Sequence, residues 1–145
     1  MTAFIVDAAR TWIGTPYVHQ ASCRGAGADC LGLVLGVWRD AVGPEPVILP
    51  PYTHDWSEPQ GDETMWREAD RLLRPAIGGT WIPGQILLFR MRDAGIAKHL
   101  GIVASTADGP SFIHAYSGHG VIESPLSQPW KRRVVARYEF PTREH

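Results

Sequence analysis

The sequence contains few cysteines and no excess of charge of either sign. It has 145 residues, of which two are cysteine, and 14 Lys and Arg residues oppose 15 Asp and Glu residues to give a net charge of −1. Two thiols form at most one disulfide, which excludes a small fold that is stabilised by several disulfides. The balanced charge excludes a strong attraction to nucleic acid or to anionic lipid. We therefore expect no nucleic-acid partner.

Long apolar runs are also missing. No segment approaches the length of a membrane span, so we expect no membrane insertion. Residues 1–7 lack the basic start and the uninterrupted apolar stretch of a secretory signal, which predicts synthesis in the cytoplasm with both cysteines as thiols. With 44% hydrophobic residues the chain can build one core of ordinary size. We predict a single domain over residues 1–145.

What is present divides into helices first and strands second. Apolar residues recur at helical spacing over residues 2–13, in the run that begins near Cys30, and over residues 65–73. Short β-type runs follow at residues 85–91, 100–105, 111–115, 120–123 and 133–138. This order predicts an α+β fold, in which N-terminal helices pack on one side of a five-stranded antiparallel sheet.

Cys30 separates a glycine loop from an apolar run. Residues 25–28 are Gly-Ala-Gly-Ala, and residues 31–38 are apolar nearly throughout. This pattern predicts a buried helix that begins near Cys30, with Asp29 as its N-cap. The free N–H groups and the dipole at that helix end predict a lowered thiol pKa and hence a nucleophile. The alternative is a small core residue, because free cysteine is often buried.

Two histidines in β-type runs supply the other parts of a cysteine-hydrolase site. We predict that His99 is the base that takes the thiol proton, and that His114 holds the imidazole of His99 in the useful orientation and tautomer. His119 competes with His114 for this third position. Tyr17 is either a packed aromatic residue or a donor of a hydrogen bond to a tetrahedral oxyanion, beside the backbone N–H of Cys30.

A zinc site built from His19, Cys23 and Cys30 is the alternative chemistry. The sequence has no Cys-x-x-Cys pair and no His-Glu-x-x-His motif, and structural zinc normally takes four protein ligands. The glycines near Cys30 match neither a Walker loop nor a dinucleotide fingerprint. We predict that the protein uses no metal and no cofactor.

Five ordered pieces of sequence resemble the NlpC-type peptidases, the papain-like cysteine hydrolases of bacterial cell walls. They are Gly-Thr-Pro-Tyr at 14–17, Asp-Cys-Leu-Gly-Leu-Val at 29–34, Pro-Gly-Gln-Ile-Leu-Leu-Phe at 83–89, His-Leu-Gly-Ile-Val at 99–103 and Ile-His-Ala at 113–115. The resemblance implies that Cys30 is the nucleophile, His99 the base and His114 the third polar residue. It places Tyr17 beside the oxyanion, and we assign Asp29 to the same oxyanion and substrate-binding side.

Members of that family cut peptide bonds in peptidoglycan stem peptides, often between D-glutamate and a diamino acid. The resemblance therefore implies a peptidoglycan endopeptidase whose substrate is the stem peptide. The compact chain, with His-Gln-Ala-Ser at 19–22, further resembles the branch encoded with phage tails and gene transfer agents. That branch implies tail proteins as partners, and a virion or tail particle that carries the protein to the periplasmic cell wall.

The sequence departs from the family pattern at three places. Leu31 stands where many members have serine, Gln85 stands where aspartate is common, and the stretch from Asp40 to Trp81 is long and aromatic. This stretch can reshape a cleft, or it can be a partner surface on a tail structural or docking protein without useful catalysis. An amidase or acyltransferase, which passes the acyl group to an acceptor other than water, is a further alternative.

Overall fold

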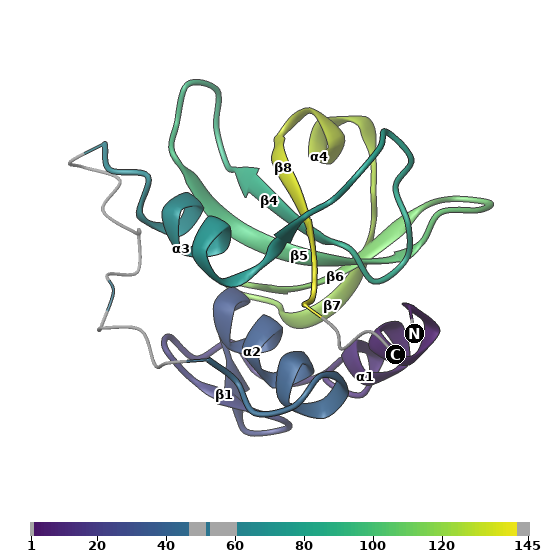
Figure 1. The fold of residues 1–145 in the computed structure, drawn as a ribbon. Coiled ribbons are helices and arrows are strands. Elements are labelled where there is room, and N and C mark those ends of the chain that lie inside the picture. Colours follow the sequence, from purple (N-terminus) through teal and green to yellow (C-terminus); the bar gives the residue numbers. More distant parts are fainter. Residues whose placement is uncertain (1, 47–51, 53–60, 142–145) are drawn as a thin grey trace.

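One antiparallel sheet organises the part of the chain that the computed structural model describes, residues 2–46, 52 and 61–141. The strands follow the order β3-β8-β4-β5-β6-β7 (Figure 1). Their bounds are β3 (Arg74–Pro75), β4 (Ile86–Arg90), β5 (Ala97–Ser105), β6 (Ser111–Tyr116), β7 (Gly120–Pro125) and β8 (Val134–Glu139). The helices are α1 (Thr2–Arg10), α2 (Cys30–Ala41), α3 (Thr64–Leu72) and α4 (Gln128–Arg132). A separate hairpin joins β1 (Ser22–Cys23) to β2 (Gly27–Ala28).

The α+β fold predicted from the order of helical and β-type patterns is confirmed. The five predicted strands are β4 to β8, but the predicted number of strands is wrong, because β3 adds a sixth at the sheet edge beside β8. β3 has two residues, one of them proline, so no alternating pattern marks it. The β1–β2 hairpin and the five-residue helix α4 are also too short to show periodicity.

Helices cover both faces of the sheet, with α1 and α2 on one side and α4 on the other (Figure 1). Successive strand residues point to opposite faces. Ile86 and Leu88 belong to the larger core, under α1 and α2. Leu87 and Phe89 belong to a smaller core, against which Trp130 of α4 packs. The predicted packing of N-terminal helices on one face is confirmed, and α4 is an addition on the second face.

Helix α2 lies at the centre of the larger core. Leu33 and Val37 are fully buried, and Gly36 lies so close to Trp12 that a Cβ added there would be 2.1 Å from a ring carbon. Trp12 in turn donates its indole N–H to Asp40 at 3.1 Å. This packing fixes the helix whose first residue is Cys30. The described helices include none with the length and apolar character needed to cross a bilayer.

Only part of the long aromatic stretch from Asp40 to Trp81 belongs to the described residues. Helix α3 contacts β5, and the carboxylate of Glu63 accepts the backbone N–H of Ala97 at 2.9 Å. Residues 47–51 and 53–60, which belong to the stretch predicted to reshape a cleft or to form a partner surface, lie outside the described residues. Glu63 and α3 therefore join this stretch to β5, the strand that carries His99.

Replacing Gly36 with alanine should destabilise the protein by up to about 2 kcal/mol. Alanine gains about 1 kcal/mol of helix propensity, but its Cβ forces Trp12 out of place, and overpacking of this kind costs about 1–3 kcal/mol. Urea unfolding measures the change. Gly79→Ala is the control, since nothing lies within 4 Å of a Cβ at that position. Equal stability of the two variants would contradict the packing described for α2.

Candidate active site

The nucleophile predicted from the sequence lies at the first residue of α2. The side chain of Asp29 accepts the backbone N–H of Gly32 at 2.7 Å, so Asp29 is the N-cap, as predicted. A Cβ at Gly32 would lie 1.8 Å from the carbonyl oxygen of Ala21, which explains the glycine there. The backbone N–H of Leu100, the residue that follows His99, lies near the Cys30 sulfur and favours its thiolate form.

The thiol of Cys30 is protonated at neutral pH. Burial raises its pKa to about 12, and the nearby carboxylate of Asp29 contributes in the same direction. Backbone N–H groups of Leu100, Leu31 and Cys30 itself act in the opposite direction without overcoming the burial. The N–H groups at the helix start thus lower the pKa as predicted, but the predicted net result, a lowered thiol pKa, is wrong because burial outweighs them. A buried neutral thiol needs a base at the moment it attacks.

The two predicted histidines lie side by side on neighbouring strands. His99 on β5 and His114 on β6 are both buried, and Nε2 of His99 is 2.7 Å from Nδ1 of His114. Trp130 lies over both rings, at centroid distances of 5.8 and 5.2 Å. The structure thus brings the proposed base and its supporting residue together inside an aromatic enclosure.

Both imidazoles are neutral at neutral pH. Burial, followed by the neighbouring charge of His114, lowers the pKa of His99 well below 6.5. Burial and then the charge of His119 lower the pKa of His114 to about 4. A neutral imidazole has a lone pair with which to accept a proton, so His99 is in the protonation state that a base requires.

The hydrogen bonds of His99 leave one ring nitrogen for the thiol. Nε2 is bound to His114, and among the described residues no hydrogen bond reaches Nδ1 of His99 or joins His99 to the Cys30 sulfur. Catalytic hydrogen bonds are often long before substrate binds. The Cys30 sulfur nevertheless lies near the backbone N–H of Leu100, the residue that follows His99 on β5.

The structure favours His114 over His119 as the third residue. His119 is exposed and stacks on Tyr116 at a centroid distance of 5.2 Å and an interplanar angle of 7°. Tyr116 in turn contacts the rings of His99 and His114, at 5.9 and 5.3 Å. His114 alone of the two candidates forms a hydrogen bond with His99 in the described structure. His119 contributes to the outer wall of the histidine enclosure.

Tyr17 lies on the Cys30 side of the site. An isolated bridge joins Tyr17 to Ala28, two residues before the cysteine. Burial raises the pKa of Tyr17 to about 12, with further contributions from Cys30 and Asp29. Its phenol therefore keeps its proton at neutral pH and can donate a hydrogen bond. The role of Tyr17 at the oxyanion stays a prediction.

Sequence reasoning missed a cluster around the Asp29 carboxylate. The hydroxyl of Tyr52 donates to Oδ2 at 2.5 Å, and the backbone N–H of Gln20 donates to the same oxygen at 2.8 Å. The carbonyl of Tyr52 is bound by the side chains of His19 and Gln20, at 3.0 and 2.7 Å. No local pattern distinguishes Tyr52 from the other aromatic residues near it. Asp29 thus ties Tyr52 to the nucleophile loop, and its predicted role toward substrate stays a prediction.

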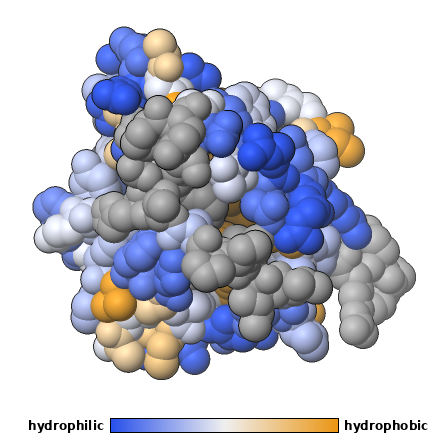
Figure 2. All heavy atoms as spheres, turned by 90° about the vertical axis from the view of Figure 1, so that its left-hand side faces the viewer, coloured by the Kyte–Doolittle hydropathy of each residue, from blue (hydrophilic) through white to orange (hydrophobic). Residues whose placement is uncertain are grey.

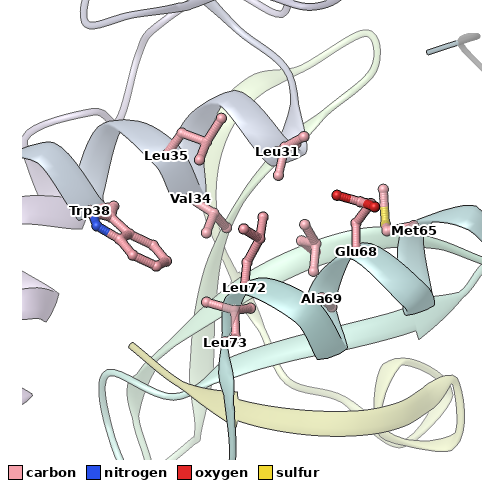
Figure 3. Close-up of a pocket in the computed structure, with 10 residues that line it drawn as sticks. Leu31, Val34, Leu35, Trp38, Met65, Glu68, Ala69, Leu72 and Leu73 are labelled. Atoms are coloured by element: carbon pink, nitrogen blue, oxygen red, sulfur yellow. The ribbon is translucent and has the colours of Figure 1, made fainter. Parts of the chain in front are cut away.

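An apolar pocket lies between α2 and α3, next to the proposed nucleophile. Figure 3 shows side chains of the two helices pointing toward one another, with Leu31 of α2 facing Met65 and Ala69 of α3. Leu100 of β5 completes the lining. The side of the molecule on which α3 lies is largely hydrophilic, with hydrophobic residues in small separate groups (Figure 2). The pocket can accept apolar atoms, and the one charged side chain in its lining, Glu68, pairs with Arg71 at 2.7 Å.

The described residues offer no obvious place for a metal ion. They contain no group of three or more His, Cys, Asp or Glu side chains arranged to hold one. His19 and Cys30 belong to the loop and helix start already described, and Cys23 is an exposed free cysteine on β1.

Known proteins resemble this chain in structure over nearly its whole length. One is the NlpC/p60 domain of peptidoglycan hydrolase SagA. The match covers 97% of this chain and 99% of that domain, at a TM-score of 0.63 and 20% identity. The chain has the NlpC/P60 fold. A second similar structure is an NlpC/P60 family protein from Bacillus cereus. That match covers 97% of this chain and 40% of the other protein, at a TM-score of 0.65 and 17% identity. The resemblance predicted from the five motif pieces is confirmed at the level of fold.

Two curated bacterial proteins are similar in sequence. One is named gamma-DL-glutamyl hydrolase, from Bacillus subtilis (strain 168); it is 28% identical over 137 residues, which are 94% of this chain and 29% of that protein. The other is murein DD-endopeptidase MepS/murein LD-carboxypeptidase of Escherichia coli (strain K12), which is 30% identical over 130 residues, 89% of this chain and 57% of that protein. This chain thus spans less than two thirds of either relative. No protein-family model matches it.

The free energy of unfolding should fall as the pH is lowered from about 6.5 toward 4, in part through His114. The pKa of His114 is about 4 in the folded protein, below the ordinary histidine value of 6.5, so the unfolded chain binds more protons in this window. The difference between the two pKa values lowers the free energy of unfolding by at most roughly 3 kcal/mol over this range of pH. Chemical unfolding at several pH values should show a smaller slope for His114→Asn than for the wild type. Equal slopes would contradict a neutral buried His114.

Proposed function

We propose that this protein is a cysteine peptidase that hydrolyses peptide bonds of peptidoglycan. One observation carries the proposal: on an NlpC/P60 fold, the helix that begins with a buried thiol packs on strand β5, which bears His99, and His99 is hydrogen-bonded to His114 on the next strand. The names of the two sequence relatives, a glutamyl hydrolase and a murein endopeptidase, support a peptide substrate of the cell wall. The bond between D-glutamate and a diamino acid is the proposed point of cleavage.

The proposed reaction begins with transfer of the thiol proton to the imidazole. As the Cys30 sulfur attacks the scissile carbonyl carbon, Nδ1 of His99 takes the proton, and Nε2–H remains bonded to His114. The hydroxyl of Tyr17 and the backbone N–H of Cys30 are the proposed donors to the oxyanion. Collapse of the tetrahedral intermediate breaks the C–N bond, and the His99 imidazolium protonates the leaving amine.

Hydrolysis of the thioester completes the proposed cycle. Water loses a proton to Nδ1 of His99 as its oxygen attacks the acyl carbon, and the sulfur leaves as thiolate. The thiolate recovers the proton from the His99 imidazolium, so the products are an amine, a carboxylic acid and the original thiol. An acyltransferase would differ only in this step, because an acceptor amine would replace water.

Cys30→Ala should abolish release of soluble fragments from purified peptidoglycan, with a fall in rate of about 10³-fold or more. Mass spectrometry of the digests measures both the rate and the new ends of the fragments. Cys23→Ala is the matched control, since Cys23 is exposed and has no part in the proposed reaction. Its rate should stay within about twofold of wild type.

Three results of this assay would count against parts of the proposal. Full activity of Cys30→Ala would exclude the thiol mechanism. Absence of any fragment release by the wild type would favour the tail structural or docking protein. Products in which a new amide replaces the expected carboxylic acid would identify an acyltransferase.

We also propose, as a separate point, that a phage-like tail carries the protein to the wall. Support comes from the similarity of residues 19–22 to the tail-associated branch of the family. Particles purified from producing cells should contain the protein in a constant ratio to tail proteins, as measured by quantitative mass spectrometry. Its absence from washed particles would overturn this route while leaving the hydrolase proposal intact.

A further inference from the structure

Ser124 extends the histidine pair into a chain of three hydrogen-bonded groups. Its Oγ lies 2.8 Å from Nε2 of His114, whose Nδ1 lies 2.7 Å from Nε2 of His99. The three residues belong to β7, β6 and β5, which are neighbours in the sheet. Both ring nitrogens of the fully buried His114 are therefore engaged.

The strand alternation explains why Ser124 faces the histidines. Glu123 pairs with Arg10 of α1, and the two nearest atoms are 3.2 Å apart. Ser124, the next residue along β7, points to the opposite face, on which α4 lies. In the register of β6 with β7, Ser124 stands opposite Phe112, and Phe112 and His114 share a face. The hydroxyl is thus directed to His114 by the fold of the sheet.

Two proton arrangements satisfy the chain, because a neutral imidazole has one N–H and one lone pair. In the first, Nε2–H of His99 donates to His114, and Nε2–H of His114 donates to Ser124. The lone pair of His99 then lies on Nδ1, where the proposed base requires it. In the second arrangement every hydrogen bond is reversed, and Nδ1 of His99 carries a proton. That second form cannot accept a proton from the thiol.

We propose that Ser124 is a positioning residue, which selects the first arrangement by accepting the Nε2–H of His114. When His99 takes up a proton, both of its nitrogens become donors, so Nδ1 of His114 must be an acceptor. If the Ser124 hydroxyl accepts the Nε2–H of His114, the lone pair of His114 lies on Nδ1. Nδ1 of His114 is then already an acceptor before the reaction starts. Ser124 is half-buried, so its own proton can turn toward solvent. The role in catalysis rests on the proposed cysteine peptidase function.

Nitrogen-15 NMR of histidine-labelled protein tests the proton arrangement without any substrate. His114 in the wild type should carry its proton on Nε2, and Ser124→Ala should convert this single tautomer into a mixture. Ser124→Thr retains the hydroxyl and should retain the single tautomer. Ser111→Ala is the control, because Ser111 donates to Glu123 at 2.7 Å instead of contacting a histidine. A proton on Nδ1 of His114 in the wild type, or no change in Ser124→Ala, would overturn the proposal.

Kinetics give the second measurement. Ser124→Ala should lower kcat by about tenfold or more, since a fraction of the molecules holds the wrong tautomer, while KM stays within about twofold. An unchanged kcat would contradict the positioning role. If the wild type cleaves no peptidoglycan, the proposed peptidase function fails, whereas the NMR result still decides whether Ser124 fixes the tautomer of His114.

Discussion

The start of α2 is held against strand β5, and the positions of the proposed catalytic groups depend on this contact. Helix α2 packs on β5, and the backbone N–H of Leu100, the residue after His99, is close enough to the Cys30 sulfur to favour its thiolate form. The helix cannot shift easily, because Asp29 caps it and Gly36 lies against Trp12. Burial of the helix therefore fixes the thiol relative to the histidine strand.

Burial also decides the protonation states from which the chemistry starts. The same dry surroundings that hold Cys30 and His99 in place favour the neutral form of each group. A neutral thiol has a proton to give, and a neutral imidazole has a lone pair that can accept it. The hydrogen bonds from His99 to His114 and from His114 to Ser124 then determine which imidazole nitrogen can receive it. Position and proton placement are thus two results of one packing arrangement.

Residues with a strong local pattern were predictable from the sequence, and residues defined by tertiary contact were not. Cys30 and His99 stand next to apolar runs whose period is visible, and the resemblance of the surrounding pieces indicated their roles. Ser124 and Tyr52 are single polar or aromatic residues whose partners lie on other elements. The raised pKa of Cys30 was missed because the local helix start is visible in sequence, whereas the burial that outweighs it comes from the fold.

The central claim is that Cys30 rests as a neutral thiol and that His99 takes its proton during the reaction. Thiolate absorbance near 240 nm, recorded against pH for the wild type and for Cys30→Ser, tests it most directly. We predict that the difference between the two proteins stays flat through neutral pH and rises only in strongly alkaline solution, since the pKa of Cys30 is about 12. A thiolate signal that titrates in the acidic range would show a resting thiolate–imidazolium pair and would contradict this claim.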